Sequence, residues 1–244
     1  MLSSDGKKII VFNGEVFNYK ELKSQLIGLG RSFRSESDTE AVLVAYEHFG
    51  EKCLELFHGM FAFAIWDEKA KNLFLARDRI GIKPLYYFNS NQFVFSSEIK
   101  AITSLPFINK KMNEEALYHY LTFAVSPAPM TMFENIQKLE PGHTLSIKQD
   151  GNIEKKKYWE PIVDSNSINK MSENEIIEEL RKLLRESIRL RMMSDVPYGV
   201  FLSGGVDSSG LVSIAKKKFN MDTKCYSIID RDDPTCPLPP PTKA

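Results

Sequence analysis

The stretch from Gly59 to Asp78 constrains the fold of this 244-residue chain more than any other part of the sequence. Two apolar runs, GMFAFAIWD and LFLARD, flank the polar segment EKAKN. This pattern predicts an antiparallel hairpin, because a chain reverses where a short polar segment separates two apolar strands. The runs are almost continuously apolar, so we expect the hairpin to lie in a buried sheet.

Further strands and helices are expected around this hairpin. Asn18 with Glu21, and Ser37 with Glu40, show the spacing of a helix capping box. Residues 98–104 and 113–123 have a helical pattern. The other expected strands are KIIVF (8–12), PLYYF (84–88), QFVFSSE (92–98) and both arms of HTLSIKQDGNIEKKKYW (143–159), which turn at Asp150-Gly151. Residues 1–160 are therefore expected to form a sheet flanked by helices.

A second unit is expected to begin near Ser172. Ser172 and Glu175 form a capping-box pattern ahead of a long amphipathic helix. The segments GVFL, SGGVDSS, GLVSIAKKKF and TKCYSII then follow in the order strand, loop, helix, strand. This order predicts a βαβ unit with a glycine-rich turn after its first strand.

Composition excludes several classes of protein. The 32 basic and 32 acidic residues balance to a net charge of zero, which argues against a nucleic-acid partner. No apolar run approaches the roughly 20 residues of a membrane-spanning helix, and no secretory signal is visible. The scattered Cys53, Cys225 and Cys236 have no metal-ligand spacing, so we expect reduced thiols in a cytoplasmic protein.

The SGGVDSS loop, Ser203–Ser209, is the strongest chemical signal. Glycines between a strand and a helix allow backbone N–H groups to surround an anion at the helix N-terminus, and the serines add hydroxyl donors. Asp207 cannot favour a phosphate directly and would orient the loop or meet a metal ion. A simple tight turn is the structural alternative, but the flanking strand and helix favour a phosphate site.

Two further candidates remain ambiguous on spacing alone. Asn13-Gly14 between apolar segments is a strong hairpin signal, yet the Asn13 side chain and the Gly14 N–H could also stabilise an oxyanion. Asp38 is either a residue of a helix start or a carboxylate that binds a ligand ammonium group. Spacing favours the structural interpretation in both cases.

Other polar residues are interpreted as structural. Arg77-Asp78-Arg79 is expected to be a charge cluster at a strand end, and Cys53 a core thiol. The histidines share no metal-binding spacing: His48, His58, His119 and His143.

Ordered motifs across the chain resemble glutamine-hydrolysing asparagine synthetases. They are NGEVFNYKEL, SDTE, GMFAFAIWDEKAKNLFLARDRIGIKPLYYF, FSSEIKA, KLEPGHTL, YW and SDVPYGVFLSGGVDSS, within residues 8–229. The resemblance implies an incomplete glutaminase of the Ntn-hydrolase fold, an α+β sandwich with αββα layers, over residues 1–160. It implies the start of an α/β ATP-pyrophosphatase domain, similar to adenine nucleotide α-hydrolases, over residues 168–230. A proline-rich tail over residues 231–244 would follow.

The resemblance also implies an activity. In that family glutamine supplies ammonia, ATP with Mg²⁺ activates aspartate as β-aspartyl-AMP, and ammonia then forms asparagine in the cytoplasm. The implied partners are therefore glutamine, aspartate and ATP, without nucleic acid or membrane. A homodimer of a full-length form is compatible with the resemblance.

Site residues follow from the matched motifs. Asn13 and Gly14 match the oxyanion pair and, with Glu15, the glutamine contacts; Asp38 matches the carboxylate that holds the glutamine α-amino group. The ATP-binding residues implied are Leu202, Ser203, Gly204, Gly205, Val206, Asp207, Ser208 and Ile228.

Two departures from the family pattern affect the expected activity. The family nucleophile is a cysteine exposed at the N-terminus, whereas Leu2 stands here and the first cysteine is Cys53. The second domain stops after one βαβ unit. We therefore expect a chain truncated at both ends and inactive as a glutaminase, with the proline-rich end either a linker or an artefact. A related ligase with another carboxylate acceptor, and a non-catalytic protein that binds glutamine or nucleotide, remain as alternatives.

Overall fold

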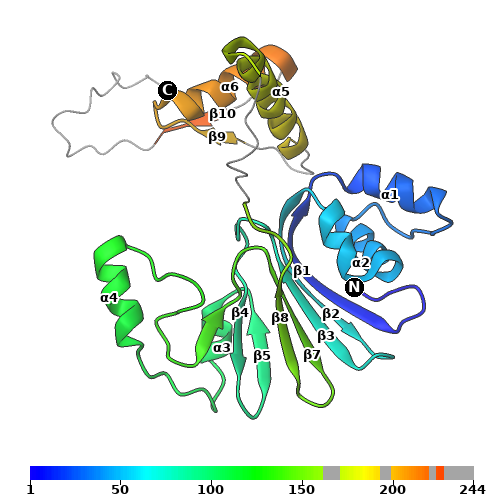
Figure 1. Ribbon diagram of the computed structural model, residues 1–244, viewed down its shortest axis with the longest axis vertical. Coiled ribbons are helices and arrows are strands. Elements are labelled where there is room, and N and C mark those ends of the chain that lie inside the picture. The colour runs from blue at the N-terminus through cyan, green and yellow to red at the C-terminus, as the bar shows by residue number, and fades with distance from the viewer. Residues whose placement is uncertain (162–170, 193–198, 220–223, 228–244) are drawn as a thin grey trace, which may run out of the picture. The chain divides into compact units, whose positions relative to one another are not determined.

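The computed structural model describes residues 1–161, 171–192, 199–219 and 224–227. The chain divides into two compact units, Met1–Asp164 and Ser165–Ala244, and each unit is described by itself (Figure 1). The proline-rich residues 231–244 and Ile228, which the sequence singled out, lie outside the described residues. Across the described ranges, no helix has the length and apolar content needed to cross a membrane.

The first unit is built on an antiparallel sheet of five strands in the order β1-β2-β3-β7-β8. The strands are β1 (Lys8–Val16), β2 (Gly59–Asp67), β3 (Asn72–Arg77), β7 (His143–Lys148) and β8 (Ile153–Lys157). The expected hairpin is confirmed, since β2 and β3 pair from Ala62↔Arg77 to Asp67↔Asn72. The hairpin predicted around Asp150-Gly151 is also confirmed by the pairing of β7 with β8.

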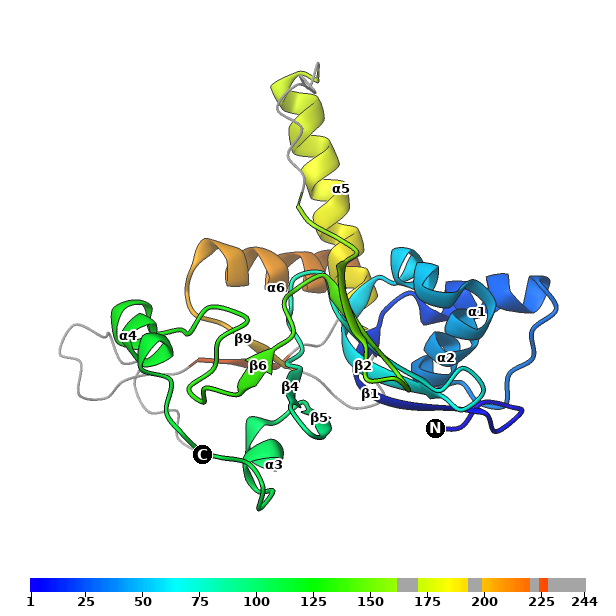
Figure 2. The same ribbon diagram turned by 60° about the horizontal axis from the view of Figure 1, so that its bottom comes forward.

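Helices cover one face of this sheet. They are α1 (Tyr19–Gly28), α2 (Asp38–Phe49) and the 3₁₀ helix η1 (Gly50–Leu56). Figure 2 shows α1 and α2 on one side of β1 and β2. Their apolar side chains enclose an aromatic core with the sheet, in which the Phe74 ring lies 5.1 Å from Tyr46 and 6.2 Å from Phe63.

A second antiparallel sheet covers the other face. It has the order β5-β4-β6, with β4 (Tyr86–Asn89), β5 (Phe93–Ser96) and β6 (Ile136–Lys138). Leu85, Tyr87 and Leu139 pack against Ala62, Leu75 and other side chains of the main sheet. Helix α3 (Ile99–Thr103) closes the outer side of the second sheet through Ile102, which packs with Phe88 and Ile136. The layers therefore run helix, sheet, sheet, helix, which confirms the expected α+β sandwich.

A further helix, α4 (Glu114–Phe123), follows α3 in the chain. The Asn113 side chain accepts a 3.0 Å hydrogen bond from the Ala116 N–H and thereby caps this helix.

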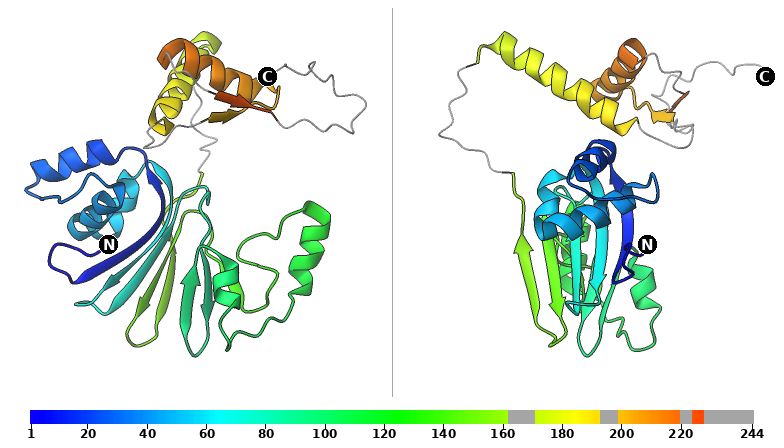
Figure 3. Two further views of the ribbon diagram at one scale, coloured as in Figure 1. Left: turned by 180° about the vertical axis from the view of Figure 1, so that it is seen from behind. Right: turned by 90° about the vertical axis from the view of Figure 1, so that its right-hand side faces the viewer.

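The second unit contains α5 (Glu173–Arg191), β9 (Gly199–Phe201), α6 (Val206–Phe219) and β10 (Lys224–Tyr226). The capping box of Ser172 and Glu175 is present, as predicted. Strands β9 and β10 pair in parallel across α6, which confirms the βαβ unit. Helix α6 contacts both β9 and α5, and Figure 3 shows α5 and α6 from two sides.

The capping box expected at Asn18 is wrong. Asn18 does precede α1, but its side chain makes no hydrogen bond to the helix start. Its amide instead donates to the Leu56 carbonyl and accepts from the His58 N–H, each at 2.9 Å. Tertiary partners far along the chain therefore replace the local cap that the spacing suggested.

Candidate functional site

Asn13, Gly14 and Glu15 lie in the interior of β1. The strand continues past them to Val16, and their partners on β2 are Ala62, Phe61 and Met60. The interpretation of Asn13-Gly14 as a hairpin turn is therefore wrong. The strand that pairs with β1 begins at Gly59, so the apolar residues that follow Gly14 continue the strand instead of reversing it.

Gly14 occupies a position that only glycine fits. Its φ is +154°, and a Cβ atom there would lie 2.2 Å from the Met60 carbonyl oxygen and 2.6 Å from the Phe61 Cα. Gly59 has the reciprocal arrangement, since a Cβ there would lie 2.2 Å from the Glu15 carbonyl oxygen. The two backbones thus approach too closely for any side chain at either position.

The backbone N–H of Gly14 faces the open edge of the main sheet. Its partner Phe61 uses both backbone groups on the opposite side: the N–H donates to Asp78 Oδ2 (3.2 Å), and the carbonyl accepts from the Asp78 N–H (2.7 Å). Gly14 and Phe61 therefore form a non-hydrogen-bonded pair, in which the polar groups of Gly14 point away from β2. Because β1 is an edge strand, these groups face outward.

Asp38 lies at the same edge. Its Oδ2 accepts a 3.1 Å hydrogen bond from the Val16 N–H, and Val16 follows Gly14 by two residues on the same side of the strand. Ser37 is the residue that caps α2, through the Thr39 N–H at 3.2 Å, while Asp38 is the first helical residue. A backbone donor and a carboxylate, separated by 24 positions in the sequence, thus share one edge.

The loop before α2 is held by a buried carboxylate. Glu40 is only 5% exposed and accepts from the Arg34 N–H (2.9 Å), the Ser35 N–H (2.7 Å) and the Ser35 hydroxyl (2.6 Å). Burial raises the pKa of Glu40, but these hydrogen bonds to the ionised form outweigh burial and hold the pKa below its usual value. Glu40 thereby fixes the segment that presents Asp38.

A cavity of about 380 Å³ lies beside Asn13. Its lining residues come from β1, β2 and the start and end of the second sheet: Val11, Phe12, Asn13, Ala62, Phe63, Leu85, Phe95, Ser96 and Ser97. The lining is largely apolar, with the Asn13 amide and two serine hydroxyls as its polar groups. Such a cavity suits a small uncharged group better than an ion.

The loop Ser203–Ser208 forms a separate site in the second unit. The hydroxyls of Ser203 and Ser208 lie 3.0 Å apart, and the Ser208 hydroxyl lies 3.3 Å from the Gly205 carbonyl. Gly204 has a φ of +81°, which favours glycine. The loop is exposed and leads into the N-terminus of the 14-residue helix α6, where backbone N–H groups favour anions.

The neighbours of this loop are also fixed. The Leu202 N–H donates to the Tyr226 carbonyl at 2.7 Å, and the Leu202 carbonyl accepts from the Ser227 hydroxyl at 2.7 Å. Asp207 is exposed in the first turn of α6, and Val206 is 89% exposed. The loop therefore starts at the paired strands β9 and β10 and leads into α6, where the Asp207 side chain is exposed to solvent.

No cluster of three or more histidine, cysteine or acidic side chains suited to a metal ion occurs in the part of the chain that the structure describes. Cys53 is buried in η1, and burial raises the pKa of its thiol to about 12. Its interpretation as a core thiol is confirmed.

The Arg77-Asp78-Arg79 cluster is structural, as expected, and its side chains hydrogen-bond to the backbone of several distant segments, which the sequence did not reveal. Asp78 is 1% exposed, and its carboxylate accepts four backbone N–H groups, from Phe61, Ile80, Ile82 and Lys83. The Arg77 guanidinium donates to three backbone carbonyls, those of Gly81, Lys83 and Leu139. Arg79 donates to carbonyls of residues 54, 55 and 57.

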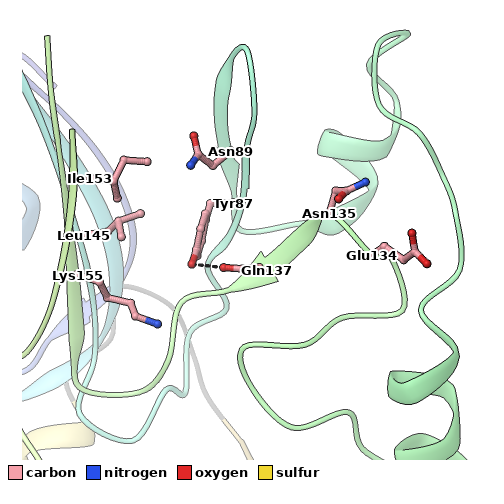
Figure 4. Close-up of a pocket in the computed structure, with 8 residues that line it drawn as sticks. All are labelled: Tyr87, Asn89, Glu134, Asn135, Gln137, Leu145, Ile153 and Lys155. Atoms are coloured by element: carbon pink, nitrogen blue, oxygen red, sulfur yellow. Dashed lines mark hydrogen bonds between the residues drawn. The ribbon is translucent and has the colours of Figure 1, made fainter. Parts of the chain in front are cut away.

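A second cavity, of about 280 Å³, was not predicted. It lies between β7 and β8 on one side and β4 and β6 on the other, and is drawn in Figure 4. The Tyr87 hydroxyl donates to the Gln137 side chain there, while Leu145 and Ile153 supply apolar surface. None of its lining residues belongs to the cavity beside Asn13.

Comparison with known proteins gives two family matches. A family described as "Glutamine amidotransferase domain" matches residues 1–159, and one described as "Asparagine synthase" matches residues 179–233.

Similar curated proteins carry related names. Asparagine synthetase [glutamine-hydrolyzing] 1 of Bacillus subtilis is 39% identical over 224 residues, which cover 90% of this chain and 34% of that protein. Putative asparagine synthetase [glutamine-hydrolyzing] 2 of Methanocaldococcus jannaschii is 40% identical over 218 residues, which cover 86% of this chain and 40% of that protein. Amidase chry2 of Gibberella zeae is 35% identical over 219 residues, which cover 88% of this chain and 31% of that protein. The chain spans between 31% and 40% of the length of these relatives.

A solved glutamine phosphoribosylpyrophosphate amidotransferase from Bacillus subtilis matches with a TM-score of 0.46 at 20% identity, over 95% of this chain and 48% of that one.

Proposed function

This chain belongs to the glutamine amidotransferase domain family, and we propose that its first unit binds glutamine as part of an enzyme that makes asparagine from aspartate, ATP and glutamine. One observation carries the proposal for the first unit. The outward N–H of Gly14 and the carboxylate of Asp38 lie along one edge of β1, where a single small molecule can reach both.

Each group has a distinct role in this proposal. Asp38 binds the α-ammonium group of glutamine, and the Val16 N–H fixes the carboxylate for that contact. The Gly14 N–H and the Asn13 side chain donate to the oxygen of the side-chain amide as it gains negative charge during attack. Glu15 is the third glutamine contact. Hydrolysis adds the oxygen of water to the side-chain amide carbon, breaks its C–N bond and yields glutamate and ammonia.

The nucleophile of this reaction is not assigned to Cys53. A thiol with a pKa of about 12 is almost entirely protonated at neutral pH, and the Cys53 side chain points from η1 into the core. The family resemblance assigns the nucleophile to a cysteine at the N-terminus, and Leu2 occupies the second position of this chain.

The second unit is proposed to bind ATP. Backbone N–H groups of Gly204 and Gly205, the N-terminus of α6, and the hydroxyls of Ser203 and Ser208 supply donors for pyrophosphate oxygens. Leu202, Val206 and Ile228 would contact the nucleotide through apolar atoms. Asp207 fits a Mg²⁺ ion, because Mg²⁺ is commonly bound by one or two carboxylates together with substrate phosphates. The ion would neutralise phosphate charge as the nucleotide reacts.

The acceptor of the ammonia is proposed to be aspartate. Relatives named asparagine synthetase support this choice, as does the match of residues 179–233 to the asparagine synthase family. A relative named an amidase, at 35% identity, favours a second candidate, in which a similar enzyme acts on another substrate. We place the protein in the cytoplasm, since its three cysteines are scattered along the sequence without the spacing of a disulfide framework.

Titration of the ¹⁵N-labelled chain with L-glutamine tests the first unit. Binding should shift the amide resonances of Gly14 and Val16, and Asp38→Asn should abolish these shifts. Glu36→Gln is the matched control, because Glu36 is an exposed carboxylate of the same loop that pairs with Lys23. Equal glutamine affinity for Asp38→Asn and the unaltered chain would refute the proposed role of Asp38.

A further inference from the structure

A single buried carboxylate completes the main sheet where β3 ends. β3 leaves the sheet after Arg77, and the carbonyl of Asp78 turns away to accept from the N–H groups of Gly81 (3.1 Å) and Gly142 (2.9 Å). In a regular antiparallel ladder that carbonyl would have accepted from the Phe61 N–H. Instead, the Phe61 N–H donates to Oδ2 of the Asp78 side chain, at 3.2 Å.

Asp78 therefore holds both polar groups of Phe61. Its own N–H donates to the Phe61 carbonyl at 2.7 Å, while its carboxylate accepts from the Phe61 N–H. The same carboxylate is itself fixed by the N–H groups of Ile80, Ile82 and Lys83. The position of Phe61 on β2 thus depends on one residue that is 1% exposed.

Phe61 in turn determines the position of Gly14. The closest atoms to a Cβ built on Gly14 are the Met60 carbonyl oxygen and the Phe61 Cα, so the backbone of β2 passes close to Gly14 at Phe61. Because Phe61 directs both of its polar groups towards Asp78, Gly14 directs its own to the open edge. Phe61 is therefore the residue through which a change at Asp78 would reach the backbone of Gly14.

Tyr158 supports the same peptide group from the other side. Its hydroxyl donates to the Arg77 carbonyl at 2.8 Å, and this carbonyl belongs to the peptide whose N–H, that of Asp78, binds Phe61. The contacts from Tyr158 through Asp78 and Phe61 to Gly14 are thus continuous.

We infer that Asp78 is a positioning residue for the glutamine site, which orients the Gly14 N–H through Phe61 without touching the substrate. The inference rests on the function proposed for that site. Asp78→Asn preserves size but places an NH₂ group against backbone N–H donors, so the Phe61 contact should be lost or displaced. The Gly14 N–H should then turn from its position at the edge.

The test uses the ¹⁵N-labelled 244-residue chain. Asp78→Asn should displace the Gly14 amide resonance and weaken L-glutamine binding by about tenfold, as expected from the loss of one hydrogen bond to the ligand. The matched control is Asp67→Asn, because Asp67 accepts the Lys69 and Ala70 N–H groups at 2.9 Å at the other end of β2, and its ion pair with Lys8 lies six residues along β1 from Gly14. The control should leave the Gly14 resonance and the glutamine affinity unchanged.

Tyr158→Phe provides a milder second variant if Asp78→Asn does not fold. It removes only the hydroxyl that binds the Arg77 carbonyl, and it should displace the Gly14 resonance in the same direction. Tyr46→Phe is its control, since the Tyr46 ring also packs in the core of the first unit. An unmoved Gly14 resonance in the folded variants would overturn the inference. Absence of glutamine binding by the unaltered chain would refute the proposed function, while the Gly14 resonance would still show whether Asp78 sets that peptide.

Discussion

Val16 donates its backbone N–H to Asp38 Oδ2 over 3.1 Å, which ties the edge strand of the main sheet to the first turn of α2. The bond satisfies a backbone group that no strand pairs, and it also restrains a carboxylate at a fixed distance along the strand from Gly14. Both consequences follow from one contact, so the integrity of the sheet edge and the geometry of the candidate site are coupled.

Replacement of Gly14 by alanine should destabilise the first unit. The added methyl group meets backbone atoms at 2.2 and 2.6 Å, and the φ of +154° is unfavourable for alanine, so the cost is about 2–4 kcal/mol. Urea unfolding should show a lower midpoint. Gly28→Ala is the control, because nothing lies within 4 Å of a Cβ there and alanine favours the helix. Equal midpoints for the two variants would contradict the close approach of β1 and β2.

The stability of the first unit should fall in acid partly because of Glu40. Its pKa is lower in the folded chain than the usual value of 4.5, so the folded state gains stability from ionised Glu40 above about pH 4.5. That gain is lost as the pH falls through the lowered folded pKa. Glu40→Gln should lose about 1.5–3 kcal/mol at pH 7 and should flatten the stability profile below pH 4.5. A variant that retains the full acid dependence would exclude Glu40 as its source.

Cys53 should resist thiol reagents while the protein is folded. Burial raises the pKa of this thiol to about 12, so little thiolate exists at pH 8 and the reagent cannot reach it. In a Cys225→Ser, Cys236→Ser background, Cys53 should react only after addition of guanidinium chloride. Rapid modification of the folded chain would show that η1 opens.

The 244-residue chain should release no ammonia from glutamine. Leu2 provides no thiol, and Cys53 is buried and protonated, so the oxyanion donors would act without a nucleophile. Ammonia and glutamate release by the purified chain is the assay. Turnover that disappears on Cys53→Ala would mean that the nucleophile has been misassigned.

Gly204→Val should abolish ATP binding by straining the loop. Nothing lies within 4 Å of a Cβ at this position, but the φ of +81° is one that β-branched residues rarely adopt. Gly204→Asn should retain more affinity, since asparagine tolerates left-handed backbone conformations. Gly210→Ala in α6 also meets open space, but its φ is helical, and it serves as the neutral control. Similar ATP affinity for the valine and asparagine variants would argue against a role for this backbone conformation.

Local patterns in the sequence predicted the elements whose partners are near in the chain. The β2–β3 and β7–β8 hairpins and the capping box at Ser172 depend on residues a few positions apart, so spacing identifies them. Asn13-Gly14 was misleading as a turn signal, because β1 pairs with a strand that begins at Gly59. That long-range pairing leaves no local trace in composition.

The candidate site was predictable only through family resemblance. Asp38 and Val16 meet across 22 positions, and nothing in the spacing of either residue signals the contact. The sequence indicates a structural role for Asp78, but the positioning role inferred for it depends on a hydrogen bond from the backbone N–H of Phe61, 17 positions earlier. A backbone donor is present in every residue except proline, so sequence cannot mark the one that matters.

The two edges of the main sheet differ in how they can meet another protein chain. β8 carries three consecutive lysines, Lys155, Lys156 and Lys157, each of which pairs with a carboxylate of the same unit, and charged side chains on an edge strand discourage pairing with a second strand. Residues 1–3 pair with the start of β1 through the Leu2↔Ile9 bridge and the hydrogen bonds between Met1 and Ile10, so the open backbone of β1 is confined to the stretch around Gly14. A charged side chain cannot protect the edge at Gly14, since a Cβ atom there would meet the backbone of β2. The short stretch of β1 around Gly14 is therefore the part of this edge that is left open to an extended segment of another chain.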